Sequence, residues 1–238
     1  MVRQPLIRRL YRERHRGESR LRDFILGWQD GLVNVLGVIL GVAAATQNAK
    51  IIIISAMAAA FAESISMMAV AYTSFKAEAD FYRSELEKEK YEIEHKRSME
   101  VEEVRKIFKN LGFTGKLLKD AVERVTSSKR RWLRTMMESE LKLMPPKASP
   151  LNIATVVGIS AFTGSLIPVL PFALLPVRTA VIVSLILSTS VLFMVGAYKA
   201  KTTIGNPIRS GIEMAIIGMM AAIVGYTIGS FFAAVITG

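Results

Sequence analysis

The chain of 238 residues contains no cysteine. Disulfide bonds and thiolate metal sites are therefore excluded, and a bound metal would need oxygen, imidazole or thioether ligands. The sequence also lacks a nucleotide-binding loop, the zinc-protease helix motif and a nucleophile elbow. The basic N-terminus has no small-residue cleavage site of a secretory signal behind it. We therefore expect a protein that is not an enzyme and that carries no prosthetic group.

Hydrophobic residues make up 51% of the chain, and the mean hydropathy is +0.35. This balance is too apolar for an ordinary soluble domain. Five apolar runs are long enough to cross a membrane, and they lie near residues 24–46, 51–75, 151–171, 178–198 and 211–236. The sequence therefore predicts an all-α integral membrane protein with five transmembrane helices.

Basic residues outnumber acidic ones by 31 to 20, which gives a formal net charge of +11. Such a charge can indicate nucleic-acid binding, but 8 of the basic residues lie in residues 1–22 and 18 in residues 76–149. The loops after the first and third spans hold only Lys50 and Arg178. This alternation follows the positive-inside rule. We expect a cytoplasmic N-terminus, a C-terminus on the far side and no nucleic-acid partner.

The same pattern divides the chain into four segments. Residues 1–22 are predicted to form a basic amphipathic helix at the cytoplasmic lipid headgroups, and residues 23–75 the first two spans. Residues 76–149 are predicted to form a cytoplasmic three-helix insert rich in Glu and Met, with a helix break near residues 95–98. Residues 150–238 hold spans three to five. An insert this small needs a second copy or a bound metal to stabilise it.

Glycine and proline give two further expectations within the spans. Glycines four residues apart predict close helix packing, within the chain or with a second copy, and they are Gly27 and Gly31, and Gly37 and Gly41. Pro168 and Pro171 predict a break near the far end of the third span.

Three carboxylates lie within the first two apolar runs. Asp23 and Asp30 are seven residues apart, so they share one helix face, and Glu63 lies in the second span. A carboxylate inside a membrane span is costly and normally faces an ion or proton route. The alternative for Asp23 is a place among the headgroups, beside the Arg-rich N-terminus.

Met67 follows Glu63 by one helical turn and shares its face. A carboxylate beside a thioether suits iron(II), a borderline cation that accepts both types of ligand. The alternative is that Met67 and its neighbour Met68 only fill space between helices.

The insert contains 14 of the 20 acidic residues. They recur at helical spacing, with Glu85, Glu89 and Glu92 on one face and Glu100 and Glu103 on another. Because lysines are interspersed among them, the spacing by itself favours a solvated surface with ion pairs over a metal site. Near the end of the insert, Met136, Met137 and Glu140 stand close together in the sequence, the first and last being four residues apart.

Several motifs, in this order, resemble the vacuolar iron transporter family over roughly residues 21–236. They are LRDFILGWQDGL in the first span, SISMMAVAY and KAEADFYRSE in the second span and its continuation, RWLRTMMESEL at the end of the insert, and GSLIPVLPF in the third span.

Members of this family are homodimers of five-span subunits that exchange iron(II), and often manganese(II), for protons between their two first helices. The resemblance implies that Asp23, Asp30 and Met67 line this pathway. It also implies a metal-binding insert, with the ligands Glu89, Glu92, Glu100, Glu103, Met136, Met137 and Glu140.

The chain departs from the family pattern at one position. The family glutamate eight residues before the Met of Ser-Met is replaced by Ala59, and Glu63 stands one turn nearer. Because a shift of four residues keeps the same helix face, we expect Glu63 to join the pathway, while its role in proton coupling stays open.

The leading hypothesis is a dimeric transporter that moves iron(II), with manganese(II) as a second substrate, out of the cytoplasm in exchange for protons. The ligand types are also compatible with zinc(II), cobalt(II) and nickel(II). The first alternative is a membrane-anchored protein that sequesters metal without transporting it, and the second is a cation channel that is independent of protons. The sequence leaves open whether the protein lies in the plasma membrane or in a vacuole-like organelle.

Overall fold

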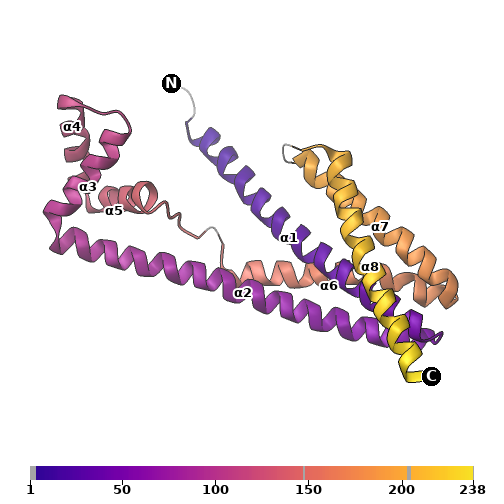
Figure 1. Cartoon of the computed structure of the whole chain (residues 1–238). Helices are drawn as coiled ribbons and strands as arrows, with labels where there is room; N and C mark the ends of the chain where they lie inside the picture. The colour runs from indigo at the N-terminus through magenta and orange to yellow at the C-terminus, as the bar shows by residue number, and fades with distance from the viewer. Residues whose placement is uncertain (1–3, 147, 203–204, 238) are drawn as a thin grey trace. The chain divides into compact units, whose positions relative to one another are not determined.

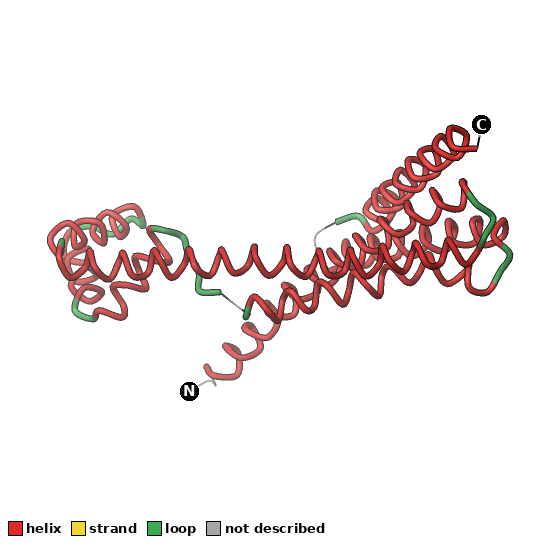
Figure 2. The backbone as a smooth tube through the Cα atoms, turned by 90° about the horizontal axis from the view of Figure 1, so that it is seen from below, coloured by secondary structure: helices red, strands yellow, loops and turns green. Residues whose placement is uncertain are grey.

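The computed structural model describes residues 4–146, 148–202 and 205–237, and it describes the side chains from residue 21 onward except residues 202, 236 and 237. Within these ranges every regular element is a helix (Figures 1 and 2). The elements are α1 (Gln4–Ala45), α2 (Ala49–His95), α3 (Arg97–Asn110), α4 (Gly115–Thr126), α5 (Lys129–Thr135), the π-helical turn η1 (Met136–Glu140), α6 (Pro150–Leu174), α7 (Val177–Thr202) and α8 (Pro207–Thr237).

Five of the described helices are long and apolar enough to cross a membrane, which confirms the predicted multi-pass, all-helical class. The qualifying segments are Leu21–Ala45, Ala49–His95, Pro150–Leu174, Val177–Lys201 and Pro207–Val235. The first of them is the continuation of a helix that begins at Gln4. The side chains that would form the predicted amphipathic face of residues 1–22 lie almost entirely outside the described residues.

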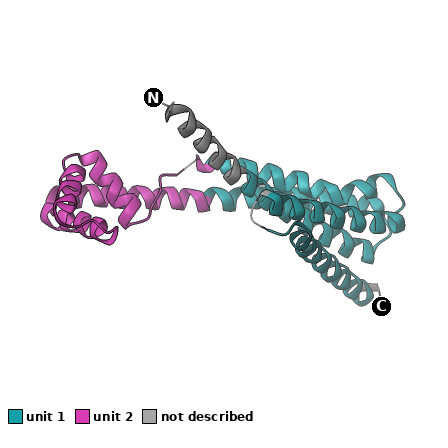
Figure 3. Ribbon diagram, turned by 90° about the horizontal axis from the view of Figure 1, so that it is seen from above, with its two compact units in different colours: residues 1–72, 151–238 teal, residues 73–150 magenta. Residues whose placement is uncertain are grey.

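Contacts between Cα atoms divide the chain into two compact units (Figure 3). The first unit comprises residues 1–72 and 151–238, and the second comprises residues 73–150. In the second unit the helix that begins as the second span ends at His95, and α3 starts at Arg97, so the break falls at Lys96 within the predicted interval. The last predicted helix of this unit is divided into α5 and η1.

In the first unit, α1 contacts α6 and α8 through glycines. A Cβ atom at Gly31 would lie 2.0 Å from the carbonyl oxygen of Ala161 in α6. A Cβ atom at Gly229 in α8 would lie 1.9 Å from the carbonyl oxygen of Gly41 in α1. Only glycine allows the backbones to approach this closely. The partners of these α1 glycines are therefore other helices of the same chain.

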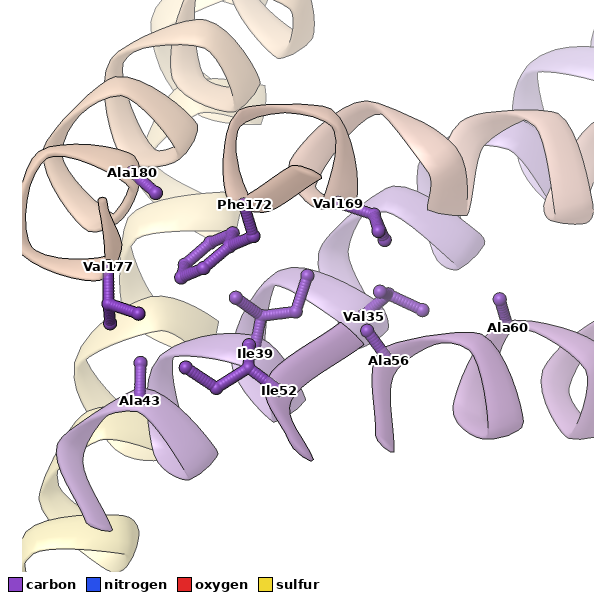
Figure 4. Close-up of a cluster of buried hydrophobic side chains, with 10 residues drawn as sticks. All are labelled: Val35, Ile39, Ala43, Ile52, Ala56, Ala60, Val169, Phe172, Val177 and Ala180. Carbon is purple, nitrogen blue, oxygen red and sulfur yellow. The ribbon is translucent and has the colours of Figure 1, made fainter. Parts of the chain in front are cut away.

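An apolar cluster joins α1 to α2, α6 and α7 (Figure 4). Small side chains on α2 let it lie close to the larger side chains of α1. The buried members are Val35, Ile39 and Ala43 from α1, Ile52, Ala56 and Ala60 from α2, Val169 and Phe172 from α6, and Val177 and Ala180 from α7. This packing fixes the part of α1 that follows Asp30.

The predicted break in the third span is wrong, because α6 continues from Pro150 to Leu174 with Pro168 and Pro171 inside it. Both prolines are buried. The hydroxyl group of Ser184 in α7 donates a 2.8 Å hydrogen bond to the carbonyl oxygen of Pro168. Neighbouring helices that pack and hydrogen-bond in this way make prolines tolerable inside a membrane helix.

Candidate metal sites

Asp30 of α1 and Glu63 of α2 come together in the first unit. Their carboxyl groups are hydrogen-bonded partners, and both residues are partly buried. Asn34, one turn after Asp30, also contacts both, and its amide nitrogen lies 3.4 Å from Oδ2 of Asp30. Sequence reasoning named both acids but missed Asn34, although its spacing of four residues from Asp30 was a usable signal.

Asp23 lies apart from this group, two helical turns or about 10 Å away along α1. It is 6% exposed. Its Oδ1 atom lies 3.1 Å from Nη2 of Arg22, whose side chain is largely exposed. Asp23 is therefore a buried carboxylate with a cationic partner in the basic end of the apolar segment.

The two adjacent methionines of α2 have different surroundings. Met68 packs on α6, since a Cβ atom at Gly158 would lie 2.8 Å from its Cε atom. Ser64, one turn before it, donates a 2.8 Å hydrogen bond to the carbonyl oxygen of Gly158. Met67 is half-buried and follows Glu63 by four residues. Met68 thus packs α2 against α6. Met67 lies on the same face of α2 as Glu63, where its thioether is available as a metal ligand.

Ala59, where the family pattern has a glutamate, packs against the apolar cluster of Figure 4. A carboxylate is therefore absent from that turn of α2, and Glu63 is the acidic residue that contacts α1.

A second group of carboxylates lies in the second unit, where the break at Lys96 brings the end of α2 against α3. Glu89 and Glu100 are 5% and 3% exposed and form a hydrogen bond to each other. Oε1 of Glu89 and Oε2 of Glu100 are buried without a hydrogen-bond partner. Burying two carboxyl groups whose oxygen atoms lack hydrogen-bond partners costs free energy unless the groups share a proton or bind a cation.

Three further glutamates interact electrostatically with this pair. Burial, followed by the hydrogen bond to Glu100 and that residue's charge, raises the pKa of Glu89 to about 8. Burial raises the pKa of Glu100, and the charges of Glu103 and Glu92 add to the effect. The pKa of Glu140 is raised by burial and then by the same carboxylates. We refer to Glu89, Glu92, Glu100, Glu103 and Glu140 as the acidic cluster.

The π-helical turn η1 places two methionines beside this unit's core. The backbone N–H of Leu141 donates to the carbonyl oxygen of Met136 at 3.1 Å, five residues back. Met136 and Met137 are 0% and 2% exposed. Met136 belongs to the apolar cluster around Trp132, whereas Met137 is buried outside that cluster. A π-helical turn in an otherwise α-helical segment often marks a functional site.

Within the described ranges, no group of three or more His, Asp or Glu side chains is arranged to hold a metal ion. In the acidic cluster Glu89 and Glu100 bond to each other instead of facing a common point. Binding a divalent ion there would replace the shared proton and move these side chains.

Comparison with known proteins identifies the family. The model of the VIT family matches residues 21–230. Vacuolar iron transporter 1 of Eucalyptus grandis is 32% identical over 204 residues, which cover 85% of this chain and 82% of that protein. Vacuolar iron transporter 1 of Arabidopsis thaliana is 31% identical, with the same coverage of both chains. The vacuolar iron transporter of Plasmodium falciparum is 28% identical over 223 residues, or 89% of this chain and 82% of the relative. The chain therefore belongs to the VIT family, with which its five apolar helices agree.

Proposed function

We propose that this protein is a transporter that moves iron(II), and manganese(II) as a second substrate, out of the cytoplasm in exchange for protons. The observation that carries the proposal is the meeting of Asp30 and Glu63 between two membrane-length helices. Carboxylates within membrane-spanning helices typically indicate an ion or proton route. The relatives are named vacuolar iron transporters, which supports iron as the substrate and a vacuole-like membrane as the location.

The proposed pathway lies between the α1 helices of two copies. Leu26, Asp30, Asn34 and Val38 follow one another at intervals of four residues and form one stripe on α1. Leu26 is 58% and Val38 38% exposed, and Asn34 is also exposed. Because polar groups facing lipid are costly, a second copy that covers this stripe would place two Asp30–Glu63 pairs beside one aqueous path.

Proton exchange follows from the ligand chemistry. Carboxylates bind a divalent cation in the deprotonated form, so metal entry releases protons and proton entry releases metal. Met67 adds a thioether on the Glu63 side, which favours iron(II) over magnesium. In the insert, the acidic cluster with Met137 would collect metal on the cytoplasmic side, while Met136 packs in the core of that unit. Asp23 would receive the metal at the mouth of the pathway.

The deciding experiment measures iron(II) uptake into proteoliposomes under an imposed pH gradient, with full-length wild type and Asp30→Asn. We expect the substitution to lower uptake by about tenfold or more, since one ligand and one proton-binding group are lost. Glu213→Gln is the matched control, because Glu213 is also a carboxylate in a span-length helix but is exposed and paired with Arg209 at 3.0 Å. Equal uptake by wild type and Asp30→Asn would exclude the proposed pathway.

The same assay separates the alternatives. A protein that only sequesters metal would bind iron(II) without filling the vesicles and would be insensitive to Asp30→Asn. A proton-independent channel would carry iron(II) at the same rate with and without the pH gradient.

A further inference from the structure

The proposed mechanism uses Asp30 and Glu63 but leaves Asn34 without a role. Asn34 donates a hydrogen bond to Asp30, and its amide also interacts with the carboxyl group of Glu63. Its amide nitrogen lies 3.4 Å from Oδ2 of Asp30, and its side chain is exposed on the α1 stripe. An exposed amide in the middle of an apolar span is costly, so a purely structural side chain at this position would be expected to be apolar.

An amide group can serve both states of a site that alternates between protons and metal. Its NH₂ group donates to carboxylates, and its carbonyl oxygen is a neutral, hard ligand for a cation. Rotation about the last side-chain bond exchanges the two without moving the helix.

Resting on the proposed transport function, we propose that Asn34 is a metal ligand that selects among divalent ions. In the empty site its NH₂ group holds the carboxyl groups of Asp30 and Glu63 together. When a divalent ion enters, the amide turns and its carbonyl oxygen becomes a third oxygen ligand.

The neutrality of this ligand matters for transport. Two carboxylates balance the charge of one divalent ion, and a third charge would hold the ion more strongly and oppose its release. The hardness of an amide oxygen matters for selection, because it favours manganese(II) and iron(II). Cobalt(II) gains relatively more from the Met67 thioether.

The test compares manganese(II) and cobalt(II) uptake by full-length wild type, Asn34→Leu and Asn34→Asp in proteoliposomes. For Asn34→Leu we expect the KM for manganese(II) to rise by about tenfold, the cost typical of a lost ligating or supporting group, and the KM for cobalt(II) to rise less. Asn34→Asp retains an oxygen ligand and adds a charge, so we expect a manganese(II) KM at or below the wild-type value together with slower turnover.

Thr227→Val is the control, because it likewise removes an exposed polar group, here a hydroxyl, from a span-length helix. Unchanged KM values in Asn34→Leu would overturn the proposal, as would an equal rise for both metals, which would indicate a structural role. If Asn34→Leu fails to elute as a single species, Asn34→Asp decides alone, and a lost manganese(II) affinity there would also overturn the proposal. Failure of the underlying transport function is recognised separately, because Asp30→Asn would then transport as well as wild type.

Discussion

At the scale of single residues, adjacent methionines with identical chemistry have different surroundings. Met136 packs in the apolar core of the second unit, and Met137 is buried outside it. The spacing of Met136 and Glu140 would place these two residues on one face only in a regular α-helix. The π-helical turn changes the register, and a local periodicity carries no signal for it. The sequence therefore identified this segment, but it could not show that Met136 lies in the core and Met137 outside it.

This division predicts different effects for two conservative substitutions. Met137→Leu should weaken cobalt(II) binding to the full-length protein by about tenfold through loss of a thioether ligand, and leave the metal-free protein equally stable. Met136→Leu should leave metal affinity unchanged and cost less than about 1.5 kcal/mol, because it conserves core volume. Calorimetric titration and thermal unfolding measure the two quantities. Equal losses of affinity in both variants would contradict the assignment.

At the scale of elements, apolar length and composition were enough to predict the five long helices. The continuity of α6 was not predictable, because its two prolines are buried against neighbouring helices. The meeting of Asp30 with Glu63 was likewise only implied, since it requires the alanines of α2 to pack against α1. Tertiary contacts, which sequence periodicity does not report, account for both differences.

The crossing of α1 and α8 gives a prediction about packing. Gly229→Ala would place a Cβ atom 1.9 Å from the carbonyl oxygen of Gly41, where backbone atoms must shift. We expect a loss of about 1–3 kcal/mol in stability, the usual cost of overpacking. Gly205→Ala is the control, because its nearest neighbour would be the Cβ atom of Ala200 at 3.4 Å. The fraction of protein that stays monodisperse after heating measures the difference, and equal fractions would contradict this crossing.

The acidic cluster gives a prediction about pH. The pKa of Glu89 is raised from 4.5 to about 8, so between these values the folded unit binds more protons than the unfolded chain. The free energy of unfolding of the metal-free unit should therefore be highest in acid and fall as pH rises through this window. Divalent metal should oppose the fall by replacing the proton.

Trp132 offers a direct measurement, because it is 1% exposed and lies in the core of the second unit. In a Trp28→Phe background it is the remaining tryptophan of the chain, and its fluorescence can follow thermal unfolding at pH 5 to 8.5. Glu89→Gln should flatten the pH dependence. A Glu102→Gln control should not, since Glu102 is exposed and paired with Arg105. A wild-type midpoint that rises with pH would show that the sign is wrong.

At the scale of the whole molecule, the absence of cysteine makes the proposed dimer directly testable. Val38→Cys on the α1 stripe should form a disulfide-linked dimer in membranes under mild oxidation. Ile223→Cys, which is also exposed but on α8, should not. Gel electrophoresis without reductant distinguishes the two, and crosslinking of Ile223→Cys alone would place the interface elsewhere.

The glycine contacts of α1 also limit how such an assembly could open and close. At Gly31 and again at Gly41 the backbone of α1 contacts that of a neighbouring helix with no side chain between them. These close contacts restrict translation and rotation of α1 relative to the other helices of its own chain. In the proposed dimer, alternating exposure of the ion to the two sides of the membrane would then come from whole subunits tilting against each other, or from movement of α2, which meets α1 through small alanine side chains.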